Sequence, residues 1–121
     1  VGTITAGGSP NALPARIEFN VFDAAQDLTV NAVVANNGTD VVGITKYGAG
    51  RLILNTSNTF TGGVIVTGGV LRITHAGALG TSVAADALRM LAGTVQLANS
   101  SSTNFVRNVT LVGSANFVVD G

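Results

Sequence analysis

The sequence predicts an all-β protein whose chain winds into a parallel β-helix, or solenoid, of about five coils. Short runs rich in β-branched residues follow one another along the chain, which is typical of strands. Paired glycines interrupt these runs at near-regular intervals, most clearly between Lys46 and Gly80. Short strands of this kind cannot bury themselves alone, so we expect further copies of the same unit to cover them.

The expected strands are short and mostly alternate between apolar and polar residues. In chain order they cover residues 16–22, 28–34, 41–45, 51–54, 64–66, 70–73, 87–91, 94–97, 109–112 and 116–119. Their inward-facing residues sort into two series that share a period of about 22 residues, as one coil of a parallel β-helix requires. The first series is Val30, Leu52, Leu71, Val95 and Phe117, and the second is Val21, Ile44, Val66, Met90 and Leu111.

Alternation adds Leu54, Ile73 and Leu97 to the expected core. A β-sandwich or jelly roll also contains many short strands with turn signals between them, and it remains the alternative fold. The shared period of the two series favours the solenoid.

The amino-acid composition argues against several classes of function. Hydrophobic residues make up 46% of the 121 residues and aromatic residues only 5%, so we expect an interior built from small aliphatic side chains. Six basic and six acidic residues cancel and are scattered singly, which argues against a nucleic-acid partner. No run approaches the roughly 18 apolar residues of a spanning helix, so we expect no membrane insertion. The absence of cysteine excludes disulfides and thiolate chemistry.

Glycines are expected at the corners of the coils, where the backbone turns tightly. The corner glycines are Gly48, Gly50, Gly62, Gly63, Gly69 and Gly80. A phosphate-binding loop at Gly48 and Gly50 is disfavoured, because a strand follows these glycines where such a loop needs a helix.

Residues 44–80 resemble the autotransporter-associated β-strand repeat, also called the passenger-associated transport repeat. The family pattern runs Leu-Thr-Lys-x-Gly-x-Gly-x-Leu-x-Leu, then Asn-Thr-Tyr-x-Gly, then a Gly-x-Leu-x-Leu strand, and ends near Ala-Leu-Gly. This chain has Ile44, Thr45, Lys46, Gly48, Gly50, Leu52, Leu54, Asn58, Thr59, Phe60, Gly62, Gly63, Gly69, Leu71, Ile73, Ala78, Leu79 and Gly80 at those places. It departs from the pattern mildly, with Ile44 for Leu, Phe60 for Tyr and Val70 where a polar residue is common.

The resemblance implies a right-handed β-helical passenger segment. It also implies export through an outer-membrane barrel of the same precursor and display on the outer surface of a Gram-negative bacterium. The barrel itself is not in this sequence.

No residue is expected to catalyse a reaction or to bind a cofactor or metal. The one histidine, His75, lies in a turn and needs partners that the sequence does not place near it. The acids fall at different corners and rungs, so a carboxylate cluster like that of glycoside hydrolases is not expected: Glu18, Asp23, Asp27, Asp40, Asp86 and Asp120. The glycine pairs also lack the aspartate of calcium-binding solenoids.

The leading functional hypothesis is a structural, non-catalytic module that extends, spaces or assembles. The second is a binding face for a glycan or host protein along Asn31, Arg51, Arg72 and Gln96, and the third is a polysaccharide-acting enzyme. Alternation directs Ile53 and Ile65 outward, where they are candidates for lateral contact.

Because neither terminus shows a polar or helical cap, we expect residues 1–121 to be a single segment or repeat unit of a longer solenoid. The expected partners are therefore further copies, stacked end to end or laterally, or adjoining coils of the same polypeptide.

Overall fold

The computed structural model describes residues 2–7, 14–82, 87–98 and 108–120. All secondary structure in these ranges is β-strand, and none of it is a helix that could cross a membrane. The described strands pair only in parallel, which confirms the solenoid and excludes the sandwich and jelly roll, whose sheets are antiparallel.

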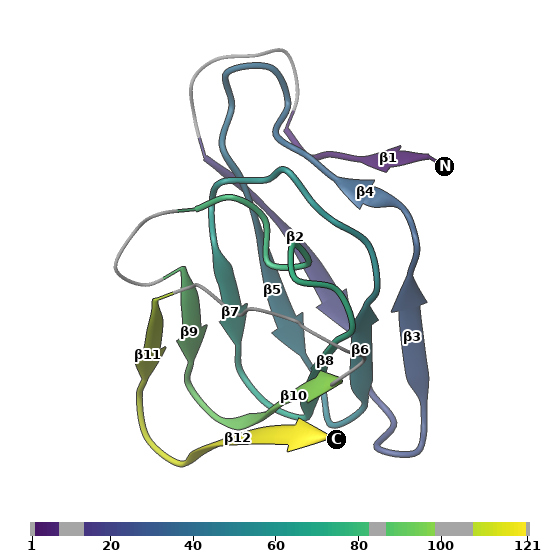
Figure 1. Ribbon diagram of the computed structural model, residues 1–121, viewed down its shortest axis with the longest axis vertical. Coiled ribbons are helices and arrows are strands. Elements are labelled where there is room, and N and C mark those ends of the chain that lie inside the picture. Colours follow the sequence, from purple (N-terminus) through teal and green to yellow (C-terminus); the bar gives the residue numbers. More distant parts are fainter. Residues whose placement is uncertain (1, 8–13, 83–86, 99–107, 121) are drawn as a thin grey trace.

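Two five-stranded sheets form two sides of the solenoid (Figure 1). The first sheet contains β2 (Ala15–Asn20), β5 (Val42–Tyr47), β7 (Val64–Val66), β9 (Leu88–Met90) and β11 (Val109–Leu111). The second contains β3 (Asp27–Val30), β6 (Arg51–Leu54), β8 (Val70–Ile73), β10 (Gly93–Ala98) and β12 (Ala115–Asp120). The chain alternates between them, so each strand pairs with its counterpart one circuit later.

In the described part of the chain, a third side closes the circuits. It begins with β1 (Thr3–Ile4) paired to β4 (Val33–Val34). The same side continues through single hydrogen bonds, from Thr59 N to the Val34 carbonyl at 2.9 Å and from Thr81 N to the Phe60 carbonyl at 3.0 Å. The chain completes four circuits between the first and the last of the five strands in each sheet. This number is close to the expected five coils.

The register of the sheets corrects the predicted stacking in both series of inward-facing residues. We call residues that stack on one another in successive coils a column. In the second sheet, Leu52 stacks between Leu28 and Leu71, while Val30 stacks on Leu54. The prediction had paired Val30 with Leu52, which is two residues out of register. Because alternation has a period of two, that error leaves each residue on its correct face.

The first sheet shows the same kind of shift. Ile44 pairs with Ile17 and Val64, not with Val21 and Val66. Val21 follows β2 and lies buried at the corner, where its amide donates to the Tyr47 carbonyl at 3.1 Å.

The core is a continuous stack of aliphatic side chains enclosed by the three sides. It buries eleven of the thirteen residues expected there: Val21, Val30, Ile44, Leu52, Leu54, Val66, Leu71, Ile73, Met90, Val95 and Leu97. The other two, Leu111 and Phe117, are 56% and 41% exposed, so their predicted burial was wrong. Both lie on β11 and β12, which have a described neighbour on one side only.

Four of the six expected corner glycines adopt a positive φ: Gly48, Gly63, Gly69 and Gly80. At Gly48, φ is 86° and an added Cβ would lie 2.2 Å from the Val21 carbonyl oxygen, so both conformation and space require glycine. Gly50 and Gly62 do not adopt a positive φ, and there close backbone neighbours are the constraint.

Candidate functional site

The coil that contains β5 and β6 carries a lysine inside the core. Lys46 follows Ile44 by two residues, so alternation along β5 directs its side chain inward, between Phe19 and Val66. The side chain is 0% exposed. Its Nζ donates to the Tyr47 carbonyl at 2.8 Å, the Gly48 carbonyl at 2.7 Å and the Gly68 carbonyl at 3.3 Å.

These carbonyls belong to the corner turns of two successive coils, so the ammonium group of Lys46 joins one turn to the next. Gly69 makes room for it, because a Cβ there would lie 2.8 Å from Nζ. Burial lowers the pKa of the Lys46 amine below its usual value, since desolvation disfavours the charged form. Three carbonyl oxygens satisfy all three donors of the ammonium group.

Arg16 joins neighbouring coils across the outer face of the first sheet. From β2 its guanidinium reaches over β5, where Nε donates to Thr45 Oγ1 at 2.7 Å and Nη2 donates to the Ile44 carbonyl. Nη1 reaches the Gly62 carbonyl at 3.2 Å. Gly43 leaves the space for this path, because a Cβ there would lie 2.5 Å from Nη1.

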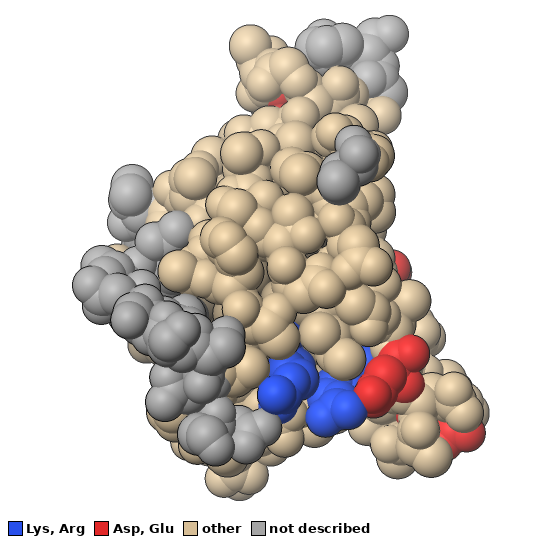
Figure 2. All heavy atoms as spheres, turned by 45° about the vertical axis from the view of Figure 1, so that its right-hand side comes forward, with Lys and Arg blue, Asp and Glu red and all other residues tan. Residues whose placement is uncertain are grey.

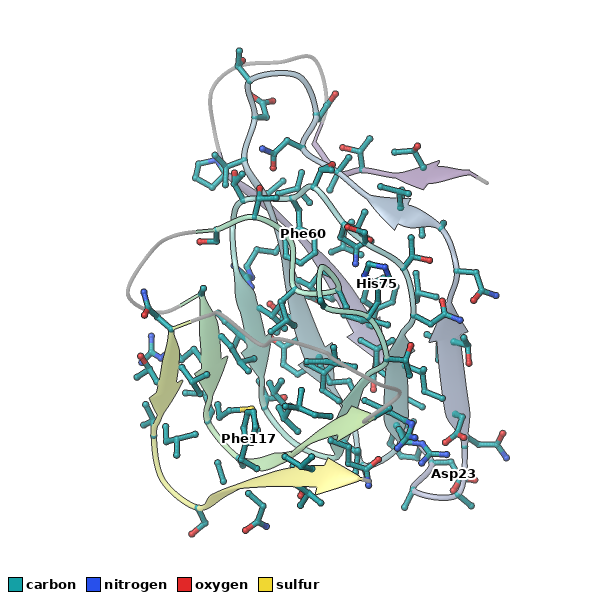
Figure 3. The ribbon with its side chains drawn as sticks, in the orientation of Figure 1. Asp23, Phe60, His75 and Phe117 are labelled. Carbon is teal, nitrogen blue, oxygen red and sulfur yellow. The ribbon has the colours of Figure 1, made fainter. Side chains whose placement is uncertain are left out.

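Asn58 connects three coils on the third side. Its Oδ1 accepts from the Val34 amide at 2.8 Å, and its Nδ2 donates to the Ala78 carbonyl at 2.7 Å. The side chain is 2% exposed, so both bonds lie inside the protein, beside the fully buried Phe60. Figure 3 shows Phe60 within the space that the coils enclose.

We call Arg16, Lys46 and Asn58 the inter-coil clamps. Each bonds a residue at least one coil away, and together they act on the first sheet, the corner turn and the third side. None of these three roles was predicted from the sequence. A signal for Lys46 was available in the alternation from Ile44, whereas long-range partners of Arg16 and Asn58 cannot be inferred from local pattern.

The candidate binding face lies on the outer surface of the second sheet. Arg51 donates to both Asp27 carboxylate oxygens, from Nε at 3.0 Å and from Nη2 at 2.5 Å. This hydrogen bonding lowers the pKa of the Asp27 carboxyl. On the next coil, Arg72 Nη1 donates to Gln96 Oε1 at 3.3 Å. Figure 2 shows basic and acidic side chains side by side on a face that is mostly uncharged.

Other residues of the predicted surfaces do not converge on one site. Asn31 is exposed beyond the end of β3, and its carbonyl accepts from Thr56 Oγ1 at 2.9 Å. Ile53 lies between Thr29 and Arg72 on the second sheet. Ile65 lies on the first sheet, so the two isoleucines do not share a sheet.

Among the described residues, the candidate catalytic side chains do not lie close together. Glu18 lies on the outer face of β2, Asp23 caps a turn by accepting from the Ala25 amide at 2.9 Å, and Asp40 is buried near a loop. His75 Nδ1 accepts from the Gly77 amide at 3.1 Å, and Figure 3 shows His75 and Asp23 in separate places. Asp86 and the side chain of Asp120 lie outside the described residues. No group of three potential metal-ligating residues occurs within the described ranges.

Comparison with known proteins gives two findings. The family model for the passenger-associated transport repeat matches residues 44–73. The adhesin BmaC autotransporter of Brucella suis biovar 1 (strain 1330) is 44% identical over 85 residues, which is 70% of this chain. The chain contains a passenger-associated transport repeat and is similar to a segment of an autotransporter adhesin.

The aligned segment amounts to 2% of the length of that adhesin, and no solved structure matches this chain. The repeat at residues 44–73 coincides with the strands from β5 to β8 and contains two of the inter-coil clamps, Lys46 and Asn58. Its pattern therefore combines core positions with side chains that join one coil to the next.

Proposed function

We propose that this chain is a structural, non-catalytic segment of a surface-displayed passenger in a Gram-negative bacterium. The observation that carries the proposal is the unbroken parallel pairing through both five-stranded sheets, reinforced by the inter-coil clamps. A solenoid of this kind extends by adding coils, and each coil needs only its neighbours to fold. Its role is to extend and space the passenger outside the cell.

The resemblance to an autotransporter adhesin supports this location and a precursor that includes an outer-membrane barrel. The partners of the segment are adjoining coils, which cover its apolar edges. The alternative is a binding face around Arg51 and Arg72. The structural role is favoured, because Arg51 already pairs with Asp27 and Arg72 with Gln96.

Surface labelling of intact bacteria tests the proposal. An epitope inserted at the exposed Gly38–Thr39 turn of the displayed protein should be accessible to antibody without breaking the cells. The core variant Leu71→Asp should lower the amount of protease-resistant displayed protein several-fold, because a buried charge disrupts the coil.

The double variant Arg51→Ala/Arg72→Ala separates the structural role from the binding role. We expect both surface labelling and adhesion to host cells to remain at the wild-type level. Loss of adhesion with normal labelling would establish the binding face instead, and an epitope reached only after the cells are broken would refute surface display.

A further inference from the structure

We propose that Lys46 determines the register in which β7 pairs with β5, and so the way in which one coil of the repeat stacks on the next. The inference rests on the proposed structural role and deepens it, because a spacer made of stacked coils needs one defined register at each step. Two observations support it. The apolar pattern of the two strands is compatible with several registers, and the contacts of Lys46 form in only one of them.

The apolar pattern of β5 and β7 does not choose between registers that differ by two residues. In the structure, Ile44 pairs with Val64 and Lys46 pairs with Val66. A shift of β7 by two residues would again direct aliphatic side chains inward, with Val66 on Ile44 or Val64 on Lys46. The hydrogen bonds of a parallel pair are evenly spaced, so the shifted strands would form a ladder of the same kind. Another feature must therefore select the observed register.

Lys46 contacts the turn after β7 through both its side chain and its backbone. Its Nζ donates to the Gly68 carbonyl at 3.3 Å, and its own carbonyl accepts from the Thr67 amide at 3.0 Å and from Thr67 Oγ1 at 2.8 Å. Since each residue of a strand advances the chain by about 3.3 Å, a shift of two residues would move this turn by about 6.6 Å along β5. The Gly68 carbonyl would then lie out of reach of an ammonium group that the carbonyls of Tyr47 and Gly48 hold in place.

Burial makes the loss of this contact unfavourable. The side chain of Lys46 is 0% exposed, so water does not replace the Gly68 carbonyl as an acceptor. Arg16 also bonds the next coil, at the Gly62 carbonyl, but that bond is exposed and water can take its place. An apolar side chain loses little when its neighbours shift, whereas a buried ammonium group is left with an unsatisfied donor. The lysine therefore distinguishes registers that the aliphatic side chains do not.

The column that contains Lys46 is otherwise apolar. Its other members on the described strands are Phe19, Val66, Met90 and Leu111. In coiled coils, a single buried polar residue in an apolar seam specifies the register, because only one alignment satisfies its hydrogen bonds. Lys46 occupies the corresponding place in this solenoid.

Disulfide trapping within one molecule reports the register, because the chain contains no cysteine of its own. Thr45→Cys with Ile65→Cys joins positions that pair in the observed register. Two other pairs, Tyr47→Cys with Ile65→Cys and Thr45→Cys with Thr67→Cys, join positions that pair only after a shift of two residues in one direction or the other. Adjacent strands lie about 4.8 Å apart, within the Cα range of a disulfide, whereas the diagonal pairs lie about 8 Å apart and beyond that range.

With Lys46 in place, we expect mild oxidation to form only the disulfide between positions 45 and 65. In the Lys46→Met background, at least one of the shifted disulfides should form several-fold faster than in the wild-type background. Mass spectrometry after alkylation of the remaining thiols measures the rates. The same column holds Met90 two coils later, so the fold accommodates a methionine there, and circular dichroism checks that the variant folds. If it does not fold, Lys46→Leu takes its place.

The matched control is Val66→Ala, which weakens packing in the same column but keeps the lysine. This variant should form only the disulfide between positions 45 and 65. Shifted disulfides at the same rate in Val66→Ala and Lys46→Met would overturn the proposal, because any loss of packing would then release the register.

The proposal would also be wrong if Lys46→Met formed only the disulfide of the observed register. Failure of both Lys46→Met and Lys46→Leu to fold would refute it as well, since the lysine would then be needed for stacking in any register. Normal surface labelling of the displayed protein in these cases would leave the proposed function standing.

Discussion

At the residue scale, the core of this solenoid tolerates one lysine because the backbone supplies its partners. Burying an ammonium group without partners costs several kcal/mol, so it normally loses its proton or stays at the surface. Lys46 instead lies where the carbonyls of Tyr47, Gly48 and Gly68 converge. The ammonium group there supplies a donor to the carbonyl oxygens of Gly48 and Gly68, which lie in the corner turns.

We predict that Lys46→Met lowers the free energy of unfolding by about 1–3 kcal/mol, the cost of leaving partly buried carbonyls without this donor. Urea denaturation followed by circular dichroism measures the change. The control is Met90→Leu in the same column, which should cost less than about 1.5 kcal/mol because it exchanges one apolar side chain for another of similar volume. A Lys46→Met protein as stable as the wild type would show that the carbonyls do not need the lysine.

The pH dependence of the same pair of proteins gives a second measure of this prediction. Burial lowers the pKa of Lys46 in the folded state below its ordinary value of 10.5, so between these two pKa values the unfolded chain binds more protons than the folded one. Wild-type stability relative to Lys46→Met should therefore rise as the pH increases toward 10.5. A difference that falls over this range would contradict the lowered pKa.

At the scale of the elements, the third side of the solenoid depends on side chains more than the two sheets do. β1 and β4 are two residues each, and beyond them the third side has single hydrogen bonds instead of long ladders. Asn58 compensates by bonding backbone groups of the coil before it and the coil after it. The side-chain amide of Asn58 thus supplies inter-coil hydrogen bonds on a side where backbone pairing is incomplete.

We predict that Asn58→Ala lowers the free energy of unfolding by about 2–3 kcal/mol, because the Val34 amide and the Ala78 carbonyl lose a buried partner. Hydrogen exchange at the Val34 amide should accelerate in parallel. The control is Asn55→Ala, an exposed asparagine three residues earlier whose loss should leave both measurements near wild type. Unchanged exchange at Val34 in Asn58→Ala would contradict the assigned role.

At the scale of the whole molecule, the contribution of an inward-facing side chain to stability should depend on whether coils cover it on both sides or on one side only. Leu71 stacks between Leu52 and Val95 and is fully buried. Phe117 continues the same column but lies at the edge, with Val95 on one side only. The surface that a side chain removes from water on folding therefore depends on how many coils cover it as well as on its size.

We predict that Leu71→Ala lowers the free energy of unfolding by about 2–5 kcal/mol, as expected for a buried leucine. Phe117→Ala should cost clearly less in dilute solution, although phenylalanine is the larger side chain. Urea denaturation at low protein concentration compares the two. Equal or larger destabilisation by Phe117→Ala would show that the edge is covered in the isolated chain.

Much of this architecture follows from local pattern. Alternation in runs such as 51–54 and 64–66 determined which side chains face inward, because successive residues of any strand point to opposite sides. Glycine spacing located the corners, since few other residues fit the turn at Gly48. The recurrence of such runs once per circuit indicated parallel stacking. The repeat pattern at residues 44–80 indicated the family, whose model matches residues 44–73.

The tertiary structure alone decided which strand positions meet and where each column ends. The register of Val30 on Leu54 depends on the length and path of the intervening turns, and a shift of two residues leaves the hydrophobic pattern unchanged. Arg16, Lys46 and Asn58 each have a partner one coil or more away, and no local pattern reveals these contacts. Exposure of Leu111 and Phe117 is likewise set by neighbouring coils, because burial is a property of what covers a side chain and not of the side chain itself.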